Sequence, residues 1–317
     1  MKTTKKLIIT FLLIFSIVMS NSMPVEANEV KEIDTGIRQE VYAVGEYSNW
    51  EGVSTVSQFL DKDKQFCFAY KKDNKIIVIK TKAGKVQKKI TLKMKGNLFG
   101  AVISDEDGYY YAVTGKKNTG DDTSKKTIFI TKYDASGNLI KSVGDNGSSS
   151  IAFYYGEQCH TKVPFNAGNC DVEINGDYLA VNYARTMYSG HQGSSVWIID
   201  KNSMETKKPA DGERDYYHNY ESHSFGQRVT PYEGGFAFIS EGDAYERAFT
   251  FSIVDVSTDT YSETPIFDFW VKKGAADAGD MRVLNNNFAH MGDLCTLNNG
   301  TISFVATSVK SLSEIAL

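Results

Sequence analysis

Histidines are the residues of this sequence with the clearest capacity for proton-transfer chemistry. The chain holds five of them, and an imidazole exchanges its proton close to neutral pH. His160 directly follows Cys159, and His223 lies in the polar segment that runs from Ser222 to Arg228. We therefore take His160 and His223 as the candidate acid/base residues for a reaction.

A second set of residues is suited to binding. The guanidinium of Arg228 could bind a carboxylate or a sulfate group of a ligand, or pair with an acid of a neighbouring repeat. The segment from Gly242 to Arg247 combines acids and a base in one loop, which also fits a solvated turn. The candidate binding residues are His191, Arg228, Asp243, Arg247 and His290.

Several familiar catalytic patterns are missing from the sequence. It has no Gly-x-Ser-x-Gly nucleophile elbow, no glycine-rich phosphate loop before a helix, and no His-Glu-x-x-His or Cys-x-x-Cys pair. We therefore expect no metal and no cofactor. Cys67 lies in an apolar run and is expected to be a free buried thiol, whereas Cys159 and Cys170 flank a loop and could bridge it.

The elements that must position these residues are strands. Beyond residue 27 the chain shows no helical period, but many runs of five to eight residues rich in Tyr, Phe, Val, Ile and Thr. Asn-Gly, Asp-Gly and Ser-Gly turns separate these runs, which is typical of consecutive antiparallel strands. The sequence therefore predicts an all-β protein.

A repeat orders the strands. A glycine, seven residues, a second glycine and an aromatic strand recur at Gly100–Gly108, Gly168–Gly176, Gly226–Gly234 and Gly292–Gly300, with a weaker copy over residues 53–70. Each copy predicts a hairpin of two strands. A third and a fourth strand follow every copy except the last, and the four copies that begin with glycine are 58 to 68 residues apart.

Four-stranded units at such spacing predict a β-propeller of about five blades, the last of them incomplete. A β-sandwich is the alternative, but it does not explain the repeat. A strand over residues 40–45 could add to the last blade and help to close the ring, but the blade would still be short, and the chain could be a truncated propeller. In a propeller, the loops entering the first strand and those joining the second to the third share one face. All five histidines fall in such loops.

The first 27 residues predict export. Three lysines precede an apolar run of about 13 residues, too short for a typical membrane-spanning helix, and a cleavage site is expected after Ala27. A retained anchor is the alternative. We assign residues 1–27 to a signal peptide, 28–39 to a linker and 40–317 to the propeller domain. The remaining chain carries a formal charge of about −6 and its charges look dispersed, so we expect neither nucleic acid nor membrane insertion.

The repeat segments also resemble known propellers. The stretches NGDYLAVNY from Asn175, SVWIIDK from Ser195 and DEDGYYYAVTG from Asp105 look like blades of propellers found in secreted bacterial proteins, the group of WD- and YVTN-like repeats. The segments beginning at His223, Gly242 and Gly292 resemble an exported propeller family of low-GC Gram-positive bacteria without an assigned activity. No Trp-Asp signature closes the blades, and the resemblance transfers no catalytic residue.

These observations lead to two functional hypotheses. The first is a secreted or cell-surface module that binds an extracellular protein or glycan through the face with the longest loops. Tyrosines in and beside those loops suit sugar stacking and protein contacts, and they are Tyr154, Tyr155, Tyr188, Tyr216, Tyr217, Tyr220 and Tyr245. The alternative is an extracellular hydrolase or lyase acting on carbohydrate at the channel mouth, with His160 and His223 in the acid/base roles.

Overall fold

The computed structural model of the chain describes residues 56–120, 122–147, 160–166, 168–187, 192–209, 224–242, 248–268 and 290–307. These ranges contain strands and turns and no helix. The described residues therefore include no helix that is long and apolar enough to cross a membrane. The prediction of an all-β protein is confirmed. Residues 1–55, with the expected signal peptide and the expected strand over residues 40–45, lie outside the described ranges.

The strands form five antiparallel sheets, which we call blades 1 to 5. Blade 1 holds β1 (Val56–Leu60), β2 (Phe66–Lys72), β3 (Lys75–Lys82) and β4 (Lys85–Lys93). Blade 2 holds β5 (Leu98–Ser104), β6 (Tyr110–Gly115), β7 (Ile128–Tyr133) and β8 (Leu139–Asp145).

Blades 3 to 5 continue the same order along the chain. Blade 3 holds β10 (Cys170–Asn175), β11 (Tyr178–Met187), β12 (Gln192–Asp200) and β13 (Glu205–Thr206), and β9 (Thr161–Pro164) pairs with the end of β11. Blade 4 holds β14 (Ser224–Tyr232), β15 (Gly235–Gly242), β16 (Ala248–Asp255) and β17 (Thr260–Asp268). The described part of blade 5 holds β18 (His290–Thr296) and β19 (Ile302–Thr307).

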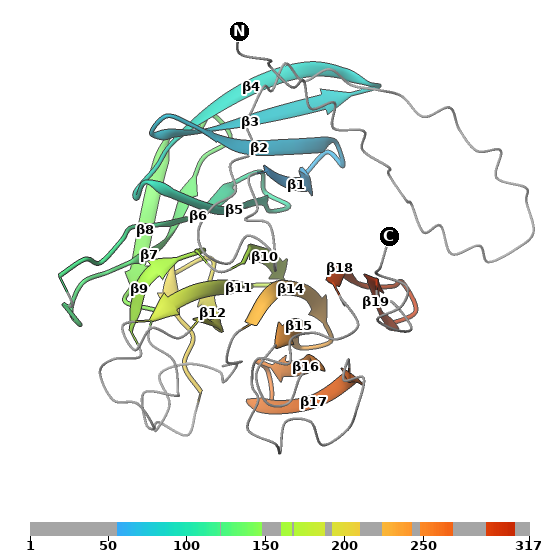
Figure 1. Cartoon of the computed structure of the whole chain (residues 1–317). Coiled ribbons are helices and arrows are strands. Elements are labelled where there is room, and N and C mark those ends of the chain that lie inside the picture. The colour runs from blue at the N-terminus through green and yellow to red at the C-terminus, as the bar shows by residue number, and fades with distance from the viewer. Residues whose placement is uncertain are drawn as a thin grey trace, which may run out of the picture.

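The blades are arranged as a β-propeller. The first strands of successive blades, β1, β5, β10, β14 and β18, lie next to one another in chain order, and the later strands of each blade lie progressively further out (Figure 1). The repeat in the sequence therefore corresponds to the first hairpin of each blade. The predicted fold class is confirmed.

The core lies between the blades. Every residue of β6 and of β15 is buried, as are most of β11 and β12, because these middle strands are covered on both faces by neighbouring blades. This explains why apolar residues follow one another in β6 and β15 without a strict alternation. The outer strands β4 and β17 are largely exposed over the side chains that the structure describes.

The first glycines of two repeat copies, Gly100 and Gly168, mark close contacts between blades. Gly100 and Gly292 interrupt the strand register as bulges, and a further irregularity spans Gly226. A Cβ atom on Gly100 would lie 2.9 Å from the ring of Phe165, which belongs to the next blade. A Cβ atom on Gly168 would overlap the carbonyl oxygen of Phe225 in blade 4. These glycines are thus required by close packing.

Side-chain acceptors link the inner strands of successive blades. A side-chain oxygen on one inner strand accepts a hydrogen bond from a backbone amide of the next at three of the junctions. The pairs are Val102 N to Ser57 Oγ at 2.9 Å, Val229 N to Asp171 Oδ2 at 2.9 Å and Thr296 N to Thr230 Oγ1 at 3.0 Å.

The described cysteines are free thiols. Cys67 is fully buried, as expected, and burial together with the nearby charge of Asp61 raises the pKa of its thiol to about 12. Cys170 is also a buried free thiol, packed in the core shared by the first three blades. Cys159, which the sequence allowed as a partner of Cys170, lies outside the described residues.

Replacing Gly168 by Ala should destabilise the propeller. The added methyl group meets backbone of the next blade rather than a movable side chain, so we expect the free energy of unfolding to fall by about 1–3 kcal/mol. Gly120→Ala is the matched control, because a Cβ atom there has open space around it. Urea denaturation measures both. Equal stability of the two variants would contradict the assigned role of Gly168.

Candidate functional site

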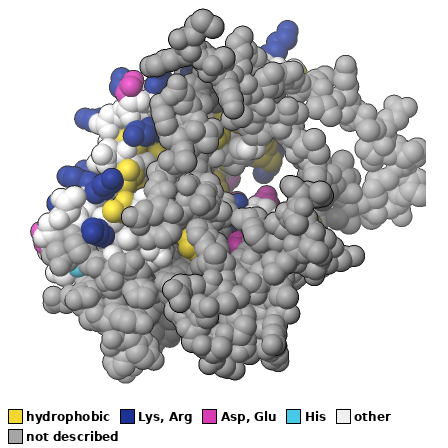
Figure 2. Space-filling model, viewed as in Figure 1, with side chains coloured by type: hydrophobic (Ala, Val, Ile, Leu, Met, Phe, Trp, Pro, Cys, Tyr) yellow, Lys and Arg dark blue, Asp and Glu magenta, His cyan; other side chains and the backbone are white. Residues whose placement is uncertain are grey.

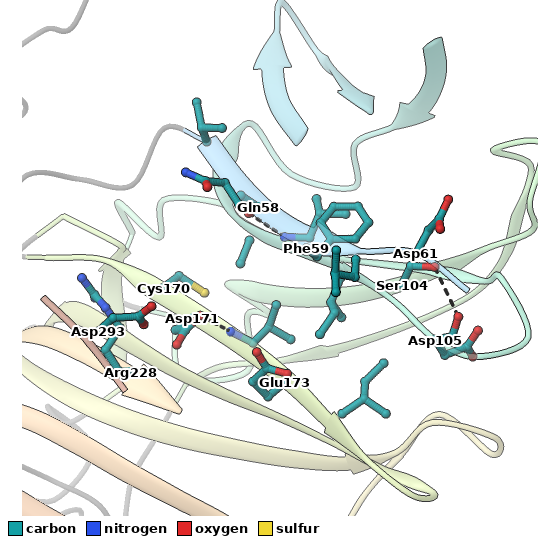
Figure 3. Close-up of a pocket in the computed structure, with 18 of the residues that line it drawn as sticks. Gln58, Phe59, Asp61, Ser104, Asp105, Cys170, Asp171, Glu173, Arg228 and Asp293 are labelled. Atoms are coloured by element: carbon teal, nitrogen blue, oxygen red, sulfur yellow. Dashed lines mark hydrogen bonds between the residues drawn. The ribbon is translucent and has the colours of Figure 1, made fainter. Parts of the chain in front are cut away.

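A cavity opens where the inner strands of the five blades converge. Its volume is about 810 Å³, and each inner strand contributes to its wall (Figure 3). Residues 56–62 and Lys64 line it from blade 1, 101–106 from blade 2, 169–174 from blade 3, Arg228 from blade 4, and Gly292 with Asp293 from blade 5.

Acidic side chains dominate this wall. The lining includes six carboxyl groups against two lysines and one arginine, and it includes no histidine among the residues that the structure describes. The carboxyl groups belong to Asp61, Asp105, Glu106, Asp171, Glu173 and Asp293.

Three of these carboxylates have structural partners. Asp61 Oδ1 accepts the backbone amides of Asp63 and Gln65, each at 2.9 Å, and Asp61 Oδ2 lies 2.5 Å from Lys80 Nζ. Asp105 caps the next turn in the same way and also accepts a hydrogen bond from the Tyr111 hydroxyl at 3.0 Å. These two residues close the first hairpins of blades 1 and 2.

Glu106 is likewise engaged in a contact between blades. Its Oε1 lies 2.6 Å from Nζ of Lys201, which belongs to blade 3. The lysine holds the pKa of Glu106 below its usual range. The other three carboxyl groups, those of Asp171, Glu173 and Asp293, are the candidates to meet a ligand, although Asp171 and Asp293 also accept backbone amides.

Alternation along β10 places two of them on one face. Cys170 and Val172 point into the core shared by the first three blades, so Asp171 and Glu173 share the opposite face. Figure 3 shows these two side chains along one strand, with Asp293 and Arg228 beyond Asp171. Asp171 accepts the amides of Val172 at 3.0 Å and Val229 at 2.9 Å.

Burial gives the two carboxyl groups different acidities. It raises the pKa of Asp171 to about 6, against the opposing effect of the positive charge on Arg228. It raises the pKa of Glu173 to about 8, with the negative charges of Asp171 and Asp293 adding to the effect. At neutral pH, Asp171 is therefore mostly ionised and Glu173 mostly protonated, so a proton acceptor and a proton donor are two residues apart on one strand.

Arg228 is anchored between two blades. Its Nε donates to the carbonyl of Gly292 at 2.8 Å, and its Nη1 donates to the carbonyl of Gln227 at 2.8 Å. Gln227 in turn is joined to Asn169, whose Oδ1 accepts the Gln227 amide and whose Nδ2 donates to the Gln227 carbonyl at 2.7 Å. The guanidinium is thereby fixed beside the acidic face of β10.

The structure places only part of the site expected from the sequence. Arg228 is on the cavity wall. His160 is buried, 2% exposed, just before β9 and is not among the residues that line the cavity. His290 begins β18 opposite Thr307. The side chain of His290, and the whole of His191, His223, Asp243 and Arg247, lie outside what the structure describes, so the histidine-bearing face stays a prediction.

Sequence reasoning missed the acidic residues of the wall. Asp171 and Glu173 alternate with Cys170 and Val172 inside a strand that the repeat identifies as an inner strand. Two acids on one face of such a strand could have predicted an acidic channel wall, because an inner strand faces neighbouring blades and the channel. Among the described residues, no group of three or more His, Cys, Asp or Glu is arranged to hold a metal ion.

Comparison with known proteins finds distant structural resemblances and no family. No protein-family model matches the chain, and no curated protein sequence matches it. Among solved structures it resembles the Dos1 propeller, with 10% identity and a TM-score of 0.44 over 79% of this chain and 53% of that one. It also resembles a glucose dehydrogenase (12%, TM-score 0.45, 84% and 80%) and the Hadza microbial sialidase Hz136 (11%, TM-score 0.43, 80% and 52%). The chain spans about half the length of the first and the last of these.

Glu173 should make the stability of the protein depend on pH. Its pKa in the folded chain, about 8, exceeds the ordinary value of 4.5, so the folded state binds more protons than the unfolded state between these values. The contribution of Glu173 to the free energy of unfolding is thus lost as the pH rises from 4.5 to about 8. We expect Glu173→Gln to raise Tm relative to wild type at pH 8.5 and to leave it nearly unchanged at pH 4.5. The exposed Glu205→Gln should show no such difference, and parallel melting curves for Glu173→Gln and wild type would refute the assignment.

Proposed function

We propose that this chain is an exported binding module that takes a glycan terminus in the acidic central cavity. The observation that carries the proposal is the set of three cavity carboxyl groups, those of Asp171, Glu173 and Asp293, beside one anchored guanidinium. Sugar hydroxyls both donate and accept hydrogen bonds. An ionised Asp171 accepts, a protonated Glu173 can do both, and Arg228 donates.

The size of the cavity supports a small ligand rather than a protein. Pockets for small molecules span roughly 300–1,000 Å³, and this cavity holds about 810 Å³. A stable protein partner needs at least about 1,000 Å² of interface, which a cavity wall of this kind does not offer. A single saccharide or a short chain end fits the proposal, and the expected signal peptide would bring the module to such ligands.

A second candidate is glycoside hydrolysis at the same place. The observation that favours it is the separation of the two pKa values on β10, about 6 for Asp171 and about 8 for Glu173. Cleavage of a glycosidic bond commonly needs one carboxylic acid to protonate the leaving oxygen and one carboxylate to act as base or nucleophile. In this proposal Glu173 is the acid and Asp171 the carboxylate.

Binding should depend on Asp171. A glycan array probed with residues 28–317 identifies the ligand, and titration of that glycan then compares variants. We expect Asp171→Asn to weaken binding at least tenfold, because a charge-assisted acceptor is lost from a partly buried site. Asp73→Asn, which alters an exposed turn of blade 1, should bind like wild type. Absence of binding across the array, or equal affinity of Asp171→Asn, would count against the proposal.

Catalysis should depend on the proton of Glu173. If the bound glycan is also cleaved, Glu173→Gln should lower kcat by about 10²–10⁴-fold, because the amide cannot donate a proton to the leaving oxygen. Its affinity for the glycan should change far less, since the amide keeps the shape and the hydrogen bonds. Reducing-sugar release and calorimetric titration measure the two quantities. Release that persists undiminished in the variant would exclude Glu173 as the acid.

A further inference from the structure

The first blade concentrates positive charge. Residues 56–97 contain twelve lysines, three aspartates, no glutamate and no arginine, a net charge of +9 in a chain whose total is −4. The rest of the sequence therefore carries −13. Charge is not dispersed along the chain, and the expectation to that effect is wrong for this blade.

Seven lysines of this blade are paired with one another across its strands, and all of them except Lys80 are exposed. Lys72, Lys75 and Lys93 are directly paired across β2, β3 and β4, and all three are exposed. Further direct pairs join Lys80 to Lys88 and Lys82 to Lys85 along the β3–β4 hairpin. We call these seven residues the lysine sheet. Alternation along β3 places the row of Lys72, Lys75 and Lys93 on one face of it and Lys80 and Lys82 on the other. Figure 2 shows Lys and Arg side chains gathered over the part of the molecule that blades 1 and 2 occupy in Figure 1.

This arrangement is unfavourable unless something neutralises it. Like charges placed directly opposite one another on paired strands destabilise a sheet. Among the described residues, the ion pairs of the lysine sheet involve Lys80 alone, which contacts Asp61 at 2.5 Å and Asp63 at 3.9 Å. The row of Lys72, Lys75 and Lys93 thus presents three positive groups on neighbouring strands, which are about 4.8 Å apart.

Protection of an edge strand does not account for the lysine sheet. Lysines on an outer strand discourage pairing with other chains, and β4 is the outer strand of its blade. The equivalent strands of the next three blades carry far fewer, however, with Lys141 in β8 and none in β13 or β17. Lys72 and Lys75 moreover lie in β2 and β3, two strands and one strand away from the outer strand β4.

We propose that the lysine sheet binds a linear acidic polysaccharide. Rows of lysine, without arginine, act as point charges and suit a chain of regularly spaced carboxylates better than a single phosphate clamped by a bidentate fork. Among the described residues, the large apolar side chains exposed on this blade are Leu60 and Val86. The blade therefore offers little apolar surface for insertion into a bilayer. The partner lies outside the central cavity, so this inference is independent of the proposed function.

The test uses polygalacturonate, an acidic polysaccharide, as the probe for the wild-type chain and two triple variants. In the first variant Lys72, Lys75 and Lys93 are each replaced by Gln. In the control variant the exposed Lys116, Lys117 and Lys126 of blade 2 are each replaced by Gln, which removes the same total charge. We expect at least a tenfold loss of affinity in the first variant and less than a twofold loss in the control, with wild-type binding weakening as salt rises.

The outcomes separate the proposal from its rivals. If the two variants lose the same affinity for polygalacturonate, overall charge alone explains the binding, and the inference is overturned. Tighter binding of wild type to phosphatidylglycerol vesicles or to DNA than to polygalacturonate of matched charge would overturn the class of partner. A thermal melt checks folding, because the first variant should unfold no earlier than wild type once like charges are removed from the row. Unchanged affinity in that folded variant would also overturn the proposal.

Discussion

Contact between the inner strands of successive blades is the constraint on which this molecule depends. These strands belong to separate sheets, so no backbone ladder joins them. The blades are held together by packed middle strands, by side-chain acceptors such as Asp171 for the amide of Val229, and by glycines that let backbones approach. Because the same strands surround the central axis, the contacts that hold the propeller together also decide which side chains line its cavity.

Asp171 shows how closely stability and the site are connected. Its carboxylate accepts a backbone amide from blade 4 and so helps to join two blades. The same position surrounds it with protein and raises its pKa, and its charge in turn raises the pKa of Glu173. A group placed there cannot be optimised for stability alone. The resulting difference in acidity is the kind of asymmetry that binding and acid/base chemistry both use.

The modest net charge of the chain conceals two separate fields of opposite sign. The cavity wall is acidic, whereas the outer strands of blade 1 carry rows of lysine. Each is a concentration of like charge that the folded state tolerates at some cost. We interpret the first as a site for a small polyhydroxylated ligand and the second as a surface for a long acidic one. A module with both features would bind a small saccharide in its cavity and a long acidic polysaccharide on its first blade.

The sequence alone determined the strand content, the hairpin repeat and the division into blades, because turn glycines and apolar strands are local signals. It also placed Arg228 on an inner strand and Cys67 in the core. Only the tertiary structure decided which polar residues meet. Asp171 and Glu173 lie in one blade, Arg228 in the next and Asp293 in another, so their proximity follows from the arrangement of the blades. His160, a candidate from its loop, is buried just before β9 and is not among the residues that line the cavity, and loop position alone does not fix the direction of a side chain.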